Sequence, residues 1–260
     1  MDRSTVLKAF ETNLWDRASF LVKARKEAEV QNTSDLLVVD SGLPCKALNV
    51  IGRSTLHPRF ALDRIEAAIK RFRVKSSPFV WVLTPQFGHG AMEPTLKDLG
   101  LKCPEEEWIM DMPLDTGAVH GNMPAGLTIK QVTLTEQVEQ FAEVLANAAT
   151  PPDEHLKTFF ADTKEAATTP SPLKLYVGYV NNEPVAVLET FNAHGILNFY
   201  SMASLASVRG KGYAGALLLN ALKEAKKASL RLAGLQTPES GRALYERIGF
   251  KPVGRIAAYS

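Results

Sequence analysis

The stretch from residue 173 to residue 204 restricts the fold more than any other part of the sequence. Its apolar runs, "LKLYVGYV", "VAVLETF" and "ILNFYSMAS", are separated only by the short turns "NNEP" and "NAHG". Strands joined by turns this tight pair antiparallel, so the stretch predicts a meander. Helical patterns at residues 212–228 and 241–248 then alternate with strand-like runs at residues 231–237 and 251–260. This mixture of strands and helices predicts an α/β (α+β) fold.

The first half of the chain contains a second set of helices and strands. Apolar residues recur at helical spacing through residues 6–22, and an amphipathic helix is predicted at residues 57–76. Further strands and one short helix are predicted at residues 35–40, 47–52, 78–85, 94–101 and 106–112. A segment rich in Gly, Pro and Asn, residues 113–126, has few apolar positions. It predicts a linker between two domains, residues 1–120 and residues 125–260.

The overall composition excludes several classes of protein. The chain has 260 residues, a formal net charge of +2 and a pI near 8.4, a balance too mild to predict binding to nucleic acid or to a membrane surface. The only cysteines, Cys45 and Cys103, form no C-x-x-C pair, so neither a disulfide framework nor a zinc site is predicted. The N-terminal residues carry charges throughout and lack the apolar core of a signal peptide. We therefore expect a cytoplasmic protein without a metal.

A glycine-rich loop, "VRGKGYAG" at residues 208–215, lies between the last strand of the meander and a helix. Its glycines match the dinucleotide pattern G-x-G-x-x-G, but that site needs an early parallel strand and an acid about 20 residues later. Here an antiparallel meander comes first, and "SLRLAGLQ" stands at that distance without an acid. A Walker loop is also excluded, because Gly212 follows Lys211 where Ser or Thr is required. Both nucleotide sites are therefore disfavoured.

The same loop fits a different phosphate site, R-x-x-G-x-A, formed by Arg209, Gly212 and Ala214. Backbone N–H groups at a helix N-terminus bind anions, and small residues let a phosphate approach closely. A loop that only caps the helix is the alternative, but glycines at 210, 212 and 215 cost conformational entropy unless close approach is needed. The sequence thus favours a phosphate-binding loop.

This loop resembles the acetyl-CoA pyrophosphate loop of the GNAT superfamily of N-acetyltransferases, whose pattern is [QR]-x-x-G-x-[GA]. The tail "ALYERIGFKPVGRIAAYS" is similar to the final helix and strand of that family, and the order of the preceding elements also agrees. The resemblance covers residues 125–260. It implies acetyl-CoA as cosubstrate and a mixed, mostly antiparallel sheet flanked by helices. The Asn that many relatives place before the final helix is absent, since "TPES" occupies that place.

An internal repeat links the two halves. The segment "VLTP…LKDLGL" at residues 82–101 runs parallel to "LQTP…YERIGF" at residues 235–250, with Gly100 matching Gly249. In this pairing Leu96 stands where the second copy has Tyr245, and no R-x-x-G-x-[GA] loop precedes the helix at residues 57–76. The repeat predicts two GNAT-like domains in tandem, of which the N-terminal one is degenerate.

The resemblance also assigns roles to particular residues. Tyr245 is expected to protonate the departing CoA thiolate, and Glu189 is the candidate general base. Without the resemblance, Tyr245 would be a packed core residue and Glu189 a solvated charge. The residues expected to bind the cofactor are those of the strand end and of the loop: Met202, Ala203, Ser204, Arg209, Gly210, Lys211, Gly212, Tyr213, Ala214 and Gly215.

The expected function is acetyl transfer from acetyl-CoA to a primary amine of a small molecule, by direct attack in a ternary complex. An acyl-CoA-binding module without turnover and a protein or peptide N-acetyltransferase are the alternatives. We expect the small-molecule amine to be the partner, and we expect binding to neither nucleic acid nor a membrane. The protein is expected to be a monomer, as an internal pseudo-dimer, or a homodimer.

Overall fold

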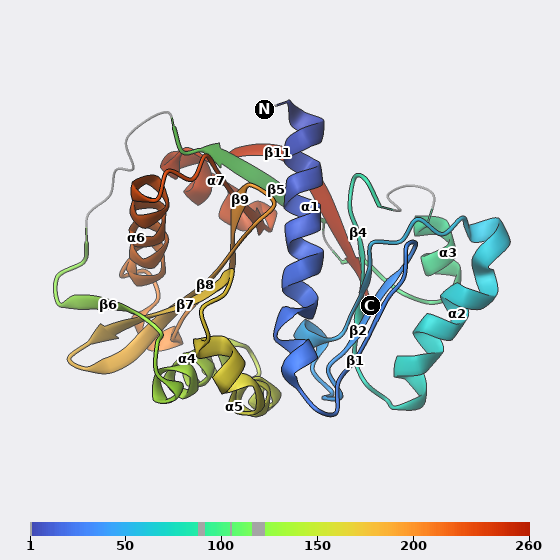
Figure 1. Cartoon of the computed structure of the whole chain (residues 1–260), viewed down its shortest axis with the longest axis horizontal. Coiled ribbons are helices and arrows are strands. Elements are labelled where there is room, and N and C mark those ends of the chain that lie inside the picture. The colour runs from blue at the N-terminus through green and yellow to red at the C-terminus, as the bar shows by residue number, and fades with distance from the viewer. Residues whose placement is uncertain (1, 88–91, 105, 116–122) are drawn as a thin grey trace. The chain divides into compact units, whose positions relative to one another are not determined.

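The computed structural model describes residues 2–87, 92–104, 106–115 and 123–260, which form two compact units (Figure 1). Unit 1 comprises Met1–Met110, Gln236–Ala243 and Pro252–Ser260, and unit 2 comprises Asp111–Leu235 and Leu244–Lys251. The helices are α1 (Arg3–Phe20), α2 (Pro58–Val74), α3 (Glu93–Asp98), α4 (Thr135–Ala148), α5 (Glu154–Thr168), α6 (Tyr213–Lys227) and α7 (Glu239–Ile248). The strands are β1 (Glu29–Asn32), β2 (Leu37–Asp40), β3 (Val50–Gly52), β4 (Val80–Leu83), β5 (Glu106–Pro113), β6 (Leu127–Gln131), β7 (Leu173–Val180), β8 (Glu183–Ala193), β9 (Ile196–Ser204), β10 (Leu232–Thr237) and β11 (Lys251–Tyr259).

Unit 1 is a sheet in the order β1-β2-β3-β4-β11, with helices on both faces. The pairings are antiparallel except that of β3 with β4, which is parallel. Ile51 faces the core that α2 and α3 cover, where Phe72 and Trp81 are fully buried. On the opposite face the Trp15 ring of α1 lies so close to Gly52 that a Cβ there would stand 2.3 Å from the ring. Helices α1 and α2 thus flank the strands (Figure 1).

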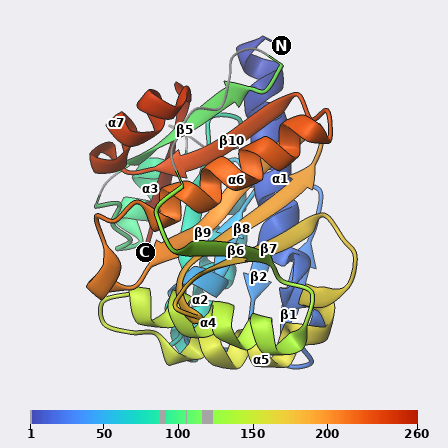
Figure 2. The same ribbon diagram turned by 90° about the vertical axis from the view of Figure 1, so that its left-hand side faces the viewer.

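Unit 2 is a sheet in the order β6-β7-β8-β9-β10. Strands β6 to β9 pair antiparallel, and β9 pairs with β10 in parallel. The Tyr176 hydroxyl of β7 donates to Glu224 of α6 at 2.8 Å, and the Tyr179 hydroxyl donates to Gln140 of α4 at 2.5 Å. Because the two tyrosines are an odd number of residues apart, α6 and α4 cover opposite faces. Figure 2 shows α6 crossing in front of β8 and β9.

The two units share one topology, since β1-β2-β3-α2-β4-α3 repeats as β7-β8-β9-α6-β10-α7 in order and direction. Helices α3 and α7 also end in the same way. Leu101 N–H donates to Leu96 O at 2.9 Å, and Phe250 N–H donates to Tyr245 O at 3.0 Å. Each bond spans a left-handed glycine, Gly100 in one case and the glycine at 249 in the other, as in a Schellman motif. The geometry therefore places Leu96 where the second copy has Tyr245.

The last strand of the second repeat, β11, lies mainly in unit 1, whereas that of the first repeat, β5, is divided between the units after Met110. Strand β11, at the end of the chain, pairs antiparallel with β4 of unit 1, with Tyr259 opposite Trp81. The segment after β5 belongs to unit 2, where Leu114 N–H donates to Arg231 O at 2.9 Å. The predicted linker falls mainly on residues 116–122, outside the described residues, so the boundary at 120–125 stays a prediction. The first half of the sequence therefore lacks one strand of unit 1.

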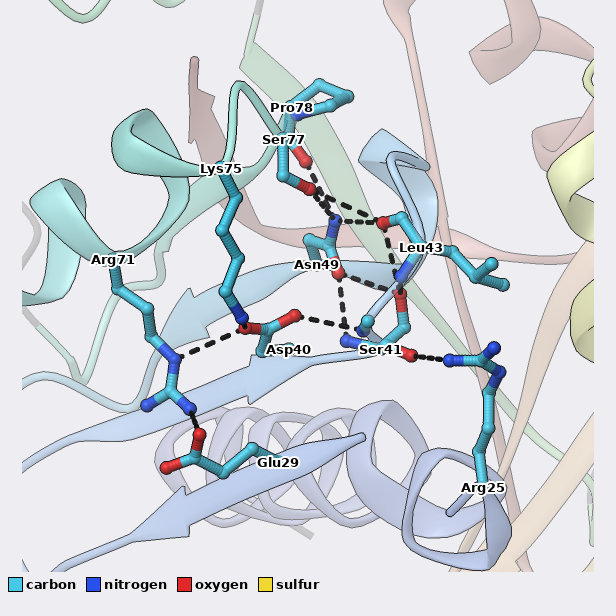
Figure 3. A network of polar contacts seen from close by, with 11 residues as sticks. Arg25, Glu29, Asp40, Ser41, Leu43, Asn49, Arg71, Lys75, Ser77 and Pro78 are labelled. Carbon is cyan, nitrogen blue, oxygen red and sulfur yellow. Dashed lines mark hydrogen bonds and ion pairs between the residues drawn. The ribbon is translucent and has the colours of Figure 1, made fainter. Parts of the chain in front are cut away.

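A buried acid of unit 1 is paired with two cations at the end of β2 (Figure 3). Asp40 accepts hydrogen bonds from Lys75 Nζ at 2.7 Å, from Arg71 Nε at 3.3 Å and from Gly42 N–H at 2.9 Å. Arg71 also pairs with Glu29 of β1. Burial alone would raise the pKa of Asp40, but these hydrogen bonds and the charge of Lys75 outweigh it and lower the pKa. The contacts tie α2 to β1 and β2.

Beside this acid, Asn49 uses both ends of its amide inside the protein (Figure 3). Its Nδ2 donates to Leu43 O at 2.8 Å, to Ser77 Oγ at 3.0 Å and to Pro78 O at 3.0 Å. Its Oδ1 accepts from Ser41 N–H at 2.9 Å. A buried polar network that satisfies its members in this way holds a loop in place. We therefore assign it to the structure of unit 1.

Glu11 of α1 is different, because its carboxyl is fully buried and only partly satisfied. Its Oε1 accepts a hydrogen bond from Gln86 N–H at 3.2 Å, whereas Oε2 has no partner among the described residues. Burial raises the pKa of Glu11 to about 7, although the Thr84 hydroxyl and the Gln86 N–H partly oppose the shift. The folded protein thus retains a proton that the unfolded chain releases near pH 4.5.

We expect Glu11→Gln to remove a pH-dependent loss of stability. Between the unfolded and folded pKa values the folded state binds the extra proton, so the free energy of unfolding falls as pH rises. The shift from 4.5 to about 7 corresponds to about 3 kcal/mol, lost by about pH 8. The variant should match the wild type near pH 4 and exceed it by about that amount at pH 8.

Urea unfolding followed by tryptophan fluorescence measures this difference in unit 1, because Trp15, Trp81 and Trp108 all belong to it. Glu66→Gln, on the exposed surface of α2, is the control and should leave the pH dependence unchanged. If the free energy of unfolding depends on pH equally in the wild type and in Glu11→Gln, the raised pKa of Glu11 would be contradicted.

Candidate active site

The glycine-rich loop leads into the N-terminus of α6. Gly210 and Gly212 both have φ of +80°, a left-handed conformation that glycine adopts without strain. The first intrahelical bond runs from Ala216 N–H to Gly212 O at 2.9 Å, so the N–H groups of residues 213–215 precede it. No side chain of the described residues caps this end. The helix therefore begins with backbone donors that are not used within the helix.

The space around these donors is open. Among the described residues, a Cβ built at Gly210 or Gly215 would meet no atom within 4 Å, and one at Gly212 would meet only Pro124 Cγ at 3.8 Å. The loop from Arg209 to Gly212 is exposed. Open backbone donors at the positive end of a helix dipole form an anion site. The arrangement suits a diphosphate.

Arg209, the first residue of the predicted motif, contacts another element. Its Nη2 donates to Ala148 O at the end of α4, at 2.8 Å. This bond anchors the loop to α4, whereas Lys211 is exposed beside it. The structure thus gives Arg209 a role in positioning the loop, and its contact with a cofactor stays a prediction.

Strands β9 and β10 separate before β9 ends. Their pairing ends at Phe199 opposite Leu235, whereas β9 continues to Ser204 with Ala203 opposite Val187 of β8. In the described residues, no β10 partner is paired with Met202, Ala203 or Ser204. The edge of β9 that faces away from β8 therefore keeps backbone groups available there.

Glu189 lies on β8 and is buried, with 3% of its surface exposed. It stands opposite Tyr200 of β9 and opposite Leu175 of β7. Its Oε2 accepts a hydrogen bond from the Ser201 hydroxyl at 2.8 Å. The prediction of Glu189 as a solvated charge is wrong, because the neighbouring strands enclose it.

Tyr245 lies on α7 and is half-buried. Its ring meets Phe250 edge-on, with centroids 6.1 Å apart, and Phe250 meets Phe199 in the same way at 6.3 Å. Phe199 is the residue at which β9 and β10 separate. Burial raises the pKa of Tyr245, so its phenol stays protonated through neutral pH. This chain of rings connects Tyr245 to the open part of β9.

The structure thus joins Glu189 to the open strand edge through Ser201, a residue that the sequence does not single out. No local signal marks Ser201, because its side chain direction depends on an irregular backbone within a strand. Among the described residues, no group of His, Cys, Asp and Glu is arranged to hold a metal ion. Within the same residues, no helix has both the length and the apolar character needed to span a membrane.

Residues 171–252 match the family model of the acetyltransferase (GNAT) domain. Acetyl transfer is the general activity of this family. A search of curated protein sequences found no significant match to the chain.

Solved structures share the fold over most of the chain. A GCN5-related N-acetyltransferase from Kribbella flavida is 17% identical, with 94% of each chain covered and a TM-score of 0.67. One from Sphaerobacter thermophilus is also 17% identical, with 88% of this chain and 81% of that chain covered and a TM-score of 0.60. A tandem GNAT protein from the clavulanic acid biosynthesis pathway is 14% identical, with 90% and 83% covered and a TM-score of 0.58. The tandem GNAT fold predicted from the sequence is confirmed.

Proposed function

We propose that the chain transfers an acetyl group from acetyl-CoA to a primary amine of a small molecule. The observation that carries this proposal is the open N-terminus of α6, which residues 205–212 connect to the open edge of β9. The helix end would bind the pyrophosphate of CoA through the N–H groups of residues 213–215. The edge at Met202, Ala203 and Ser204 would hydrogen-bond the pantetheine arm.

The proposed reaction is direct attack in a ternary complex. The amine nitrogen attacks the thioester carbonyl, and backbone N–H groups on the edge of β9 stabilise the oxyanion. The C–S bond then breaks, and the departing thiolate takes the proton of the Tyr245 hydroxyl. The raised pKa of Tyr245 keeps that proton available at neutral pH. A primary amine is mainly protonated at neutral pH and must lose a proton before it attacks. Glu189 is the proposed base that accepts this proton.

The test is a thiol-release screen with acetyl-CoA and a panel of primary amines, with mass spectrometry of the products. The proposal expects CoA thiol and acetylated amine in equal amounts for at least one small amine. Two arms separate the alternatives, one with peptides that carry free α-amino groups and lysines, and one that measures acetyl-CoA binding alone. Activity confined to peptides, or binding without turnover across the panel, would overturn the proposal.

A further inference from the structure

We propose that Ser201 is the proton relay between the acceptor amine and Glu189. This inference rests on the proposed acetyl transfer and adds a residue to it. Its basis is a hydrogen bond, a strand bulge and a difference in burial, all within unit 2.

The burial of Glu189 requires an intermediary. Its carboxylate lies within the sheet of unit 2, and only 3% of the residue is exposed. The side chain lies on the face that α4 covers, because Leu175 opposite it shares that face with Tyr179. A carboxylate in this position does not meet a substrate directly. A proton can reach it only through a neighbouring group that exchanges protons.

Ser201 is such a group. Its hydroxyl donates to Glu189 Oε2 at 2.8 Å, while the residue itself is partly exposed. The oxygen of this hydroxyl has lone pairs, so it can accept a proton on one side while it donates on the other. Ser201 therefore connects the buried carboxylate to the surface of β9.

The backbone of β9 is deformed to make this contact. Side chains alternate along a regular strand, so Ser201 would face away from Tyr200 and hence away from Glu189. Instead Leu188 of β8 opposes both Ser201 and Met202, which defines a bulge. Ser201 has φ of +47°, a conformation that residues other than glycine rarely adopt. The bulge turns the hydroxyl toward Glu189, and such local strain often accompanies function.

The bulge also sets the position of the relay relative to the proposed reaction. Ser201 immediately precedes the open edge at residues 202–204 and follows the separation of β9 from β10 at Phe199. In the proposed complex the thioester lies along this edge. The hydroxyl thus stands between the reacting edge and the buried base.

The proton passes from the ammonium to Glu189 through Ser201. An N–H bond of the ammonium breaks and its proton moves to Ser201 Oγ, while the Ser201 proton moves to Glu189 Oε2. The products are a neutral amine and a protonated Glu189, which returns its proton to solvent through Ser201 after turnover. This relay is useful only for an acceptor that arrives as an ammonium ion.

The test compares Ser201→Ala with the wild type, using an amine identified by the thiol-release screen. Alanine keeps the Cβ and removes the hydroxyl. We expect kcat/KM for the amine to fall about 100-fold near pH 7, the usual scale for losing a positioned proton acceptor. Toward the pKa of the amine the deficit should shrink by up to about tenfold per pH unit, because solvent then supplies the free amine. The affinity for acetyl-CoA should stay within about twofold.

Two further variants complete the experiment. Glu189→Gln should show the same pH-dependent deficit, and the double variant should lose little more than either single one, because the two residues act as one path. Ser207→Ala, an exposed serine in the turn after β9, is the control and should keep full activity.

The possible results distinguish a proton relay from a structural role of Ser201 and from a failure of the proposed function. A deficit that stays constant with pH, or a loss of acetyl-CoA affinity, would show a structural role and overturn the relay. Full activity of Ser201→Ala at neutral pH would also overturn it, while wild-type turnover leaves the proposed function intact. Absence of turnover in the wild type, with every amine tested, would overturn the proposed function and the relay together.

Discussion

Tyr245→Phe is expected to lower kcat about 100-fold and to leave KM for both substrates almost unchanged. The substitution removes the proton that the thiolate needs as the C–S bond breaks, and it keeps the ring. The ring of the variant would still meet Phe250 edge-on, as the tyrosine ring does at 6.1 Å. The free energy of unfolding should therefore change by no more than about 1 kcal/mol, the value of one hydrogen bond. Steady-state release of CoA thiol across pH measures the effect.

The pH profile adds a second check on this role. Since burial raises the pKa of Tyr245, the alkaline fall of wild-type kcat should lie above the ordinary tyrosine value near 10. Tyr179→Phe, which removes a hydroxyl bonded to Gln140 of α4, is the matched control and should retain kcat. Equal kcat in the wild type and Tyr245→Phe would mean that the residue is only a packed tyrosine.

Gly212→Asp should weaken acetyl-CoA binding by about 100-fold or more, since like charges brought together at a binding site cost several kcal/mol. The glycine has φ of +80° at the start of α6, and a Cβ there would meet only Pro124 Cγ at 3.8 Å. Asp and Asn tolerate this backbone conformation better than other residues, so the fold should persist. The new carboxylate would stand at the site proposed for the pyrophosphate.

Gly212→Asn separates charge from size, because its side chain has the same shape without the negative charge. We expect it to bind acetyl-CoA at least about tenfold more tightly than Gly212→Asp, since about 1.4 kcal/mol of repulsion corresponds to that ratio. Calorimetry with the wild type and the two variants makes the comparison. Wild-type affinity in a folded Gly212→Asp protein would rule out this loop as the pyrophosphate site.

The elements of this fold were predictable where their signals are local. The helix at residues 57–76 and the meander at residues 173–204 follow apolar periodicity and turn residues, and both are confirmed. The correspondence of Leu96 with Tyr245 was also predictable, because each precedes the glycine that ends its helix. Strand β1 was missed, since "EVQN" at an edge of the sheet is mostly exposed and has no apolar pattern.

Long-range pairing was not predictable in the same way. The strand at residues 251–260 was correctly predicted as a strand, but its pairing with β4 depends on contacts between residues about 180 positions apart in the sequence. The burial of Glu189 depends likewise on residues of β7 and β9 that enclose it. Ser201 reaches it only because one residue adopts a positive φ. Composition and periodicity report none of these.

We expect only the C-terminal repeat to bind the cofactor. The equivalent helix of unit 1, α2, begins with Pro58, and its N-terminus is capped by His57, whose Nδ1 accepts from Arg59 N–H at 3.3 Å. Helix α6 has no side-chain cap among the described residues. Calorimetric titration of the full chain with acetyl-CoA tests this difference most directly. We predict one acetyl-CoA site per chain. Either two equivalent sites or no binding would contradict this expectation.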